Sequence, residues 1–225
     1  NGTVTLTLTA SAVSPCTVSA TDTKILTIQK SPTANAGLDV TICQTATHAL
    51  SGIAANYASV LWTTSGNGTF SSTSSLTSVY TPGTVDISNG TVTLTLTASA
   101  ISPCTISATD TKILVIQKSP TANAGNDATI CESQIHTLSG TATNQASVLW
   151  TTSGNGTFSS TSSLTPVYTP GSLDVLNSTV ELCLLAYGMA NCENVSDCLT
   201  LTINQSPSDQ INLNPGWNLI SFDVI

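Results

Sequence analysis

Basic residues are scarce in this chain. Four Lys and no Arg stand against twelve acidic residues, and the formal net charge is −8. Proteins that bind nucleic acid or an anionic membrane surface need a patch of basic side chains. The composition therefore excludes both as expected partners.

Long apolar runs are absent as well. The longest lies near residues 182–190 and is far shorter than the roughly 20 residues that cross a bilayer, so we expect no membrane span. Only 7% of the residues are charged, but 40% are hydrophobic. These alternate strictly with polar residues, which favours folded β structure over disorder.

Motifs for catalysis are also missing. No Gly-x-Ser-x-Gly elbow occurs, and SGNGTF at residues 65–70 lacks the third glycine and the following helix of a dinucleotide-binding loop. His48 and His136 have no Cys or carboxylate at ligand spacing on the same strand. We expect no enzyme activity, no cofactor, and no catalytic or metal site, with both histidines structural.

Several aspartates recur near predicted linkers and turns. Carboxylates at such places could hold Ca²⁺ between neighbouring domains, or they could cap turns and loops; we expect the second role and keep the first as the alternative. The residues are Asp39, Asp86, Asp110, Asp127 and Asp174.

An 88-residue repeat organises the sequence. Residues 1–88 and 89–176 differ at 18 positions, and residues 177–206 keep the outline of 89–119 with one deletion. The polar stretch QKSPTANAG, at Gln29 and again at Gln117, has the composition of a linker. We expect the C-terminal hairpin of an incomplete repeat at 1–30, a repeat at 31–118, a repeat with a diverged C-terminal half at 119–206, and the start of a further truncated module at 207–225.

Alternating apolar and polar residues place the strands. VTLTLTA at residues 92–98 and TKILVIQ at 111–117 predict two antiparallel strands with one buried face and a long connecting loop. DATIC, HTLSG and SVLWTTS predict three more in the second repeat, and Asn-Gly at Asn67 and Asn155 predicts tight hairpin turns. The pattern contains no helical period and indicates a β-sandwich of about seven strands per repeat, with Trp62 and Trp150 in the cores.

Four stretches of the repeats are distinctive: PTANAGLDVTIC, SVLWTTSGNGTF, TPGTVDISNGTVTLTLTA and TDTKILVI. Together they resemble the PKD-like, immunoglobulin-like repeats of large secreted and cell-surface proteins of Bacteroidetes-type bacteria. PKD domains proper carry a Trp-Asp-Phe-Gly-Asp-Gly turn, whereas Trp62 is followed by Thr-Thr-Ser-Gly-Asn-Gly, so the similarity is to the PKD-like branch. It implies tandem all-β sandwich domains in a linear array, used as spacer, stalk or adhesive segment, with no catalytic residues to carry over.

Five of the seven cysteines fall at repeat-equivalent positions. Cys16, Cys104 and Cys192 correspond to one another, as do Cys43 and Cys131. The simplest pairing lies within each domain, Cys43 with Cys104 and Cys131 with Cys192. In a standard sandwich, however, the first strand's end and the last hairpin loop lie at opposite ends, so the alternative links Cys43 to Cys192 of the next repeat.

Two further cysteines belong to the third hairpin. Cys183 and Cys198 replace outward-facing threonines on its two strands, and we expect a disulfide between them. Either pairing scheme predicts an oxidising compartment. We therefore expect an extracellular or bacterial cell-surface location.

The expected function is that of a non-enzymatic structural or adhesive repeat segment. The alternative is a carbohydrate-binding accessory module of a secreted enzyme, which would need a planar row of exposed aromatic residues. Expected partners are neighbouring repeats or identical subunits, with a head-to-tail filament and binding of surface glycans as alternatives. The apolar residues Val4, Leu6 and Leu8 of hairpin 1–30 need a cover, because an isolated hairpin is marginal in water.

Overall fold

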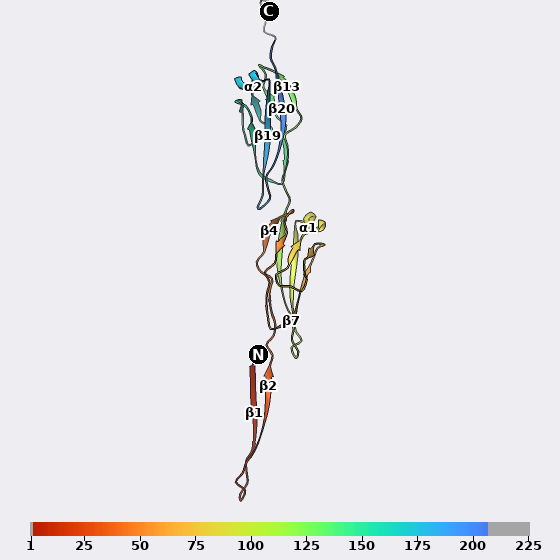
Figure 1. Cartoon of the computed structure of the whole chain (residues 1–225), viewed down its shortest axis with the longest axis vertical. Coiled ribbons are helices and arrows are strands. Elements are labelled where there is room, and N and C mark those ends of the chain that lie inside the picture. The colour runs from red at the N-terminus through yellow and green to blue at the C-terminus, as the bar shows by residue number, and fades with distance from the viewer. Residues whose placement is uncertain (1, 207–225) are drawn as a thin grey trace, which may run out of the picture. The chain divides into compact units, whose positions relative to one another are not determined.

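The computed structural model describes residues 2–206, in which short strands predominate and two helices of six residues each occur (Figure 1). The predicted module at 207–225 lies outside the described residues. Contacts divide the described residues into unit 1, residues 2–120 with 188–193, and unit 2, residues 121–187 with 194–206. Neither helix of the described part is long enough to cross a membrane.

The chain begins with a two-stranded hairpin, formed by β1 (Gly2–Ala10) and β2 (Ala20–Ile28). The strands pair antiparallel from Gly2 with Ile28 to Ala10 with Ala20. Every residue of both strands is exposed, so the apolar side chains of this hairpin are uncovered in the described structure.

The larger sheet of unit 1 has the strand order β4-β11-β10-β7. Antiparallel pairing joins β7, β10 and β11, whereas β4 runs parallel to β11. The strands are β4 (Val40–Cys43), β7 (Tyr57–Thr64), β10 (Thr91–Ala100) and β11 (Ala108–Gln117). In β10 the alternation places Val92, Leu94, Leu96 and Ala98 in the core and the threonines on the other face.

The facing layer of unit 1 consists of shorter strands. One small sheet pairs β3 with β6, and the other has the order β5-β9-β8. Their bounds are β3 (Thr33–Asn35), β5 (His48–Ala49), β6 (Ile53–Ala55), β8 (Thr69–Phe70) and β9 (Val79–Thr81). Helix α1 (Thr84–Asn89) leads into β10 and ends at Gly90, whose φ of 73° is left-handed.

The core of unit 1 lies between these layers. Trp62 is 1% exposed and donates its indole N–H to the Ser75 carbonyl at 3.0 Å. Phe70 packs between Trp62 and Tyr80, with ring centroids 6.3 and 4.9 Å apart. Complete burial of a tryptophan with a satisfied N–H makes this residue the largest apolar contribution to the core.

Unit 2 repeats the plan. Its larger sheet has the order β13-β20-β19-β16, and the smaller sheets are β12-β15 and β14-β18-β17. The bounds are β12 (Thr121–Asn123), β13 (Ala128–Cys131), β14 (His136–Thr137), β15 (Thr141–Thr143), β16 (Gln145–Thr152), β17 (Thr157–Phe158), β18 (Val167–Thr169), α2 (Ser172–Asn177), β19 (Thr179–Gly188) and β20 (Val195–Asn204). Trp150 is buried here as Trp62 is in unit 1.

The prediction of an all-β sandwich with buried Trp62 and Trp150 is confirmed. The prediction that the chain contains no helix is wrong. Helices α1 and α2 have six residues each, which is too short to show a 3.6-residue period in the sequence. Their N-caps are Gly83 and Gly171. The tight hairpin turns predicted at Asn67 and Asn155 are also wrong, since β16 neighbours β19 and β17 neighbours β18 in unit 2. β7 pairs with β10 and β8 with β9, so the chain crosses there from one sheet to the other.

Candidate functional site

A buried carboxylate fixes this crossing in each unit. Asp86, at the start of α1, accepts backbone N–H groups of Asn67 and Gly68 at 3.0 Å each, and that of Gly83 at 3.0 Å. The Tyr80 hydroxyl donates to it at 2.6 Å. Asp174 and Tyr168 make the equivalent bond in unit 2, also at 2.6 Å.

The surroundings of Asp86 determine its ionisation. Burial alone would raise the pKa of the carboxyl, but the hydrogen bonds from Tyr80, Gly83, Asn67 and Gly68 outweigh burial and hold the pKa below its usual value. Burial, together with the bond to Asp86, raises the pKa of Tyr80 to about 12. The pair is thus a fixed carboxylate and a neutral phenol, suited to holding a loop rather than to exchanging protons.

The glycines of SGNG make room for this network. A Cβ at Gly66 would collide with the Asp86 carboxylate, and one at Gly68 would collide with the Tyr80 hydroxyl. The turn and loop role expected for Asp86 from the sequence matches these bonds. Sequence reasoning missed its bond to the Tyr80 hydroxyl.

The remaining recurring aspartates also hold backbone. Asp39 accepts the N–H of Ile113 at 2.7 Å, and Asp110 accepts that of Ala36 at 2.7 Å. Asp127 accepts the N–H of Thr200 at 2.8 Å. These bonds match the turn and loop role expected from the sequence.

The two histidines are half-buried, on β5 and β14. His48 Nε2 lies 2.9 Å from Nζ of the buried Lys112. Burial, and then the Lys112 charge, lowers the pKa of His48, and burial lowers that of His136. One group with metal-ligand geometry occurs among residues 2–206, Glu181 with Cys183 and Cys198, but both of its sulfurs belong to a disulfide.

A disulfide joins Cys43 to Cys192. Cys43 ends β4, and Cys192 lies in the turn 188–193, which belongs to unit 1. The bond is packed against the segment after β11: Cys43 Sγ lies 3.5 Å from Ser119 Oγ, and Cys192 Sγ lies 3.5 Å from the Gln117 carbonyl oxygen. It therefore connects the first complete sequence repeat to the second.

The pairing of Cys43 with Cys104 and of Cys131 with Cys192 is not the one in the structure, where Cys16, Cys104 and Cys131 are free thiols. The reason is the direction of β4. It runs parallel to β11, with Cys43 opposite Gln117 at the end of that strand. Cys104 precedes the start of β11, and a ten-residue strand separates the two by about 30 Å.

The disulfide expected between Cys183 and Cys198 is present. The two residues are directly opposite in the register of β19 and β20. Their sequence positions already indicated this, because neighbouring strands bring opposed side chains within reach of a disulfide.

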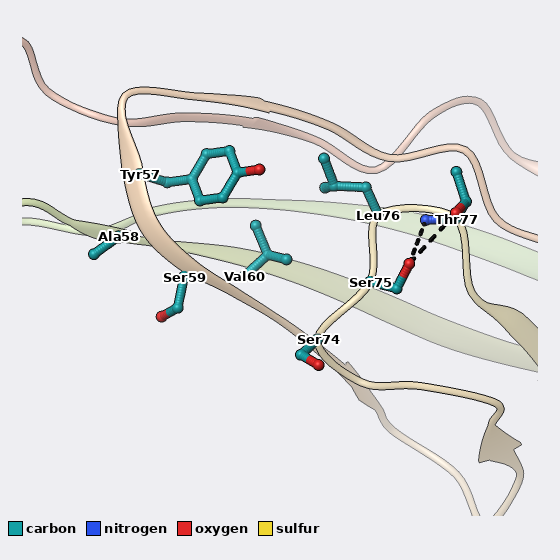
Figure 2. A pocket seen from close by; sticks show the side chains of 8 residues that line it. All are labelled: Tyr57, Ala58, Ser59, Val60, Ser74, Ser75, Leu76 and Thr77. Atoms are coloured by element: carbon teal, nitrogen blue, oxygen red, sulfur yellow. Dashed lines mark hydrogen bonds between the residues drawn. The ribbon is translucent and has the colours of Figure 1, made fainter.

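Unit 1 also has a groove of about 480 Å³ beside the start of β7. Tyr57, Val60 and Leu76 give it an apolar wall, and Figure 2 shows Ser75 turned toward Thr77 at the rim. The Thr77 backbone N–H donates to Ser75 Oγ at 3.2 Å. Gln145 replaces Tyr57 in the second repeat, so the aromatic side chain of this wall is specific to the first.

The layers and strand orders of both units define an immunoglobulin-like β-sandwich. No protein-family model matches the chain, and no curated protein sequence matches it. Solved structures that it resembles include mouse clustered PcdhgC3 EC1-3, at 14% identity over 90% of this chain and 76% of that one, with a TM-score of 0.51.

Two other similar structures are Protocadherin Gamma B2 extracellular cadherin domains 3-6 and the D00-D0 domain of Intimin. The first has 13% identity and a TM-score of 0.40, and the match covers 76% of this chain. The chain spans about half of the protocadherin fragment, 47% of its length. The second has 14% identity and a TM-score of 0.42, over 75% of this chain and 98% of that one. At 14% identity, the likeness to the PcdhgC3 structure extends to the fold alone.

Proposed function

We propose that the chain is a non-enzymatic structural or adhesive repeat segment of a secreted or cell-surface bacterial protein. It acts as a stalk or spacer that carries tension between modules. Residues 31–118 and 119–206 are its two complete repeats. The observation that supports this most directly is the covalent bond between consecutive repeats, Cys43 to Cys192.

The bond has a mechanical consequence. Cys43 and Cys192 are 149 residues apart in sequence, but their Cα atoms are 4.9 Å apart. When the two ends of the chain are pulled, the force passes through the disulfide. The residues between Cys43 and Cys192 therefore bear no load. Those residues contribute no extension even when their strands separate.

The internal design of the repeats fits a load-bearing element. Asp86 and Asp174 fix the sheet crossings through several hydrogen bonds each. Six aromatic residues pack in the two cores, and the groove beside β7 is lined by one aromatic, Tyr57. We therefore favour a structural role over the carbohydrate-binding alternative, which relies on rows of exposed rings.

Single-molecule stretching tests the proposal. The oxidised chain, held at both ends, should extend far less than the reduced chain. The difference corresponds to the 149 residues between the cysteines, or roughly 500 Å at about 3.6 Å per extended residue.

The variant Cys43→Ser is the matched control. It should reach nearly the full extension without reductant, because only the short Cys183–Cys198 loop stays closed. Equal contour lengths with and without reductant in the unmodified chain would refute the load-bearing role.

A further inference from the structure

The Cys43–Cys192 disulfide provides a template for the other cysteines. The hairpin turns that hold Cys16, Cys104 and Cys192 are closed in the same way. Each cysteine donates its N–H to the residue three positions earlier, Val13, Ile101 and Met189, at 2.9, 2.9 and 3.1 Å. The three turns thus share this hydrogen bond. The first two each contain a cis Ser-Pro peptide bond, and the third has Ala190 at a positive φ of 49° instead. Only Cys192 is paired.

Cys104 occupies the same local environment as Cys192. Its thiol donates to the Gln29 carbonyl at 3.5 Å, and Cys192 Sγ lies 3.5 Å from the carbonyl of the equivalent residue Gln117. Cys104 is half-buried, whereas Cys16 is exposed. The turn around Cys104 is therefore already placed against the preceding linker, in the arrangement that forms the disulfide one repeat later.

The β1–β2 hairpin gives a second and independent indication. Leu6 is 52% exposed, whereas its repeat equivalent Leu94 is 0% exposed. Leu94 belongs to a core cluster to which residues 31–88 contribute Trp62 and Tyr80, among others. A segment with the pattern of residues 31–88 is thus the cover that fits the apolar face of β1–β2.

Both indications lead to one partner. A segment with the pattern of residues 31–88 would cover β1–β2, and it would also carry a cysteine equivalent to Cys43 at the end of its β4-like strand. In the template, that strand end adjoins the linker at Gln117. By equivalence it would adjoin Gln29, where the Cys104 thiol already lies.

We infer that Cys104 and the apolar face of β1–β2 form one docking site for a further repeat segment of the residue 31–88 type, which Cys104 binds through a disulfide. The inference rests on the proposed function as a repeat array and adds the residue that links the module docked on β1–β2. A second copy of this chain does not fit, because its own residues 31–88 are already covered by β10 and β11.

The linkage is an oxidation that needs a disulfide-exchanging oxidant, such as oxidised glutathione. One cysteine thiolate attacks the oxidant, which gives a mixed disulfide and releases one glutathione thiolate. The other thiolate attacks the protein sulfur of the mixed disulfide and releases the second glutathione. Two thiols thus lose two electrons and two protons, and the oxidised glutathione becomes two reduced molecules.

The test uses the full chain with a second copy of residues 31–88 fused ahead of Asn1. After refolding in a glutathione redox buffer, free thiols are alkylated and peptides are mapped without reduction. We expect a peptide that links the added cysteine to Cys104, loss of Cys104 alkylation, and protection of β1–β2 from amide exchange. Cys16 and Cys131 should remain alkylated.

Two matched variants complete the experiment. Serine in place of the added cysteine should restore Cys104 alkylation and leave β1–β2 protected. Cys104→Ser should leave the added cysteine free. In both variants the β1–β2 hairpin should remain protected from amide exchange. A misfolded fusion would lose this protection, so the two explanations can be distinguished.

Three outcomes would overturn the inference: a bond from the added cysteine to Cys16, an unprotected hairpin in the fusion, or a dimer of the unextended chain linked through Cys104 and Cys131. The same non-reducing peptide map also detects the peptide that links Cys43 to Cys192. Its absence would contradict the proposed function, whereas its presence with Cys104 still free contradicts only the further docking site.

Discussion

At the scale of single residues, Asp86 and Asp174 are buried carboxylates that stabilise the fold. Each is 1% exposed and holds a chain crossing and a tyrosine hydroxyl in place. A buried carboxylate is costly unless it is fully hydrogen-bonded. Here several donors converge on each one, so ionisation is favoured and stability becomes dependent on pH.

The pH dependence follows from the direction of the shifts. Hydrogen bonding lowers the pKa of Asp86 and of Asp174 in spite of burial. Their contribution to stability is therefore complete above the unfolded pKa, about 3.9, and is lost as the pH falls through the lower folded value. We expect the free energy of unfolding, measured in urea from pH 6 downward, to fall steeply below about pH 4.

The double variant Asp86→Asn/Asp174→Asn should be less stable at neutral pH and should have a flatter profile below pH 4. Asp22→Asn is the control, because Asp22 is exposed and bonds only to the adjacent N–H of Thr23. An unchanged slope in the double variant would show that other carboxyl groups cause the acid sensitivity.

Trp150 is among the largest fully buried side chains, and it lies in the core of unit 2. Its side chain is 1% exposed, and its N–H is satisfied by the Ser163 carbonyl at 3.0 Å. Trp150→Ala should cost about 3 to 5 kcal/mol in the free energy of unfolding, since it removes a large buried side chain and leaves a cavity. Circular dichroism during urea unfolding measures this, and a loss below about 1 kcal/mol would mean that the residue is not part of the core.

At the scale of elements, two almost identical hairpins have opposite environments. The β10 row of Val92, Leu94 and Leu96 is buried, whereas the β1 row of Val4, Leu6 and Leu8 is exposed. The sequence of the strand is the same in both cases. What differs is the layer that faces it.

A matched pair of substitutions tests this difference. Leu94→Ala should cost about 2 to 5 kcal/mol, as a fully buried leucine does. Leu6→Ala should change the free energy of unfolding by less than about 0.5 kcal/mol, as exposed substitutions do. Chemical denaturation of both variants under the same conditions gives the comparison, and equal losses would show that β1 is covered in solution.

At the scale of the whole molecule, the Cys43–Cys192 bond closes a loop with a sequence separation of 149, against 15 for Cys183–Cys198. In the chain-entropy model, these loops correspond to about 5 and about 3 kcal/mol. Replacing Cys43 and Cys192 by serine should therefore destabilise the chain more than replacing Cys183 and Cys198. The reverse order in thermal or urea unfolding would mean that native-state packing, and not loop length, governs the two bonds.

The sequence by itself determined the features that depend on local pattern. Alternation in VTLTLTA and TKILVIQ placed β10 and β11, because the two faces of a strand differ in burial. Repeated tryptophans indicated the cores, and the opposed positions of Cys183 and Cys198 indicated their bond. The helices were beyond such reasoning, because six residues are too few to show a helical period.

Only the tertiary structure decided which cysteine Cys43 meets. The answer depends on β4 running parallel to β11, which places Cys43 beside Gln117 and away from Cys104. It depends equally on the turn 188–193 lying in unit 1. Asp86 likewise meets Asn67 and Gly68 only because the chain crosses between sheets there. These partners are far apart in sequence, and their meeting is set by strand order and direction, which alternation along a single strand does not encode.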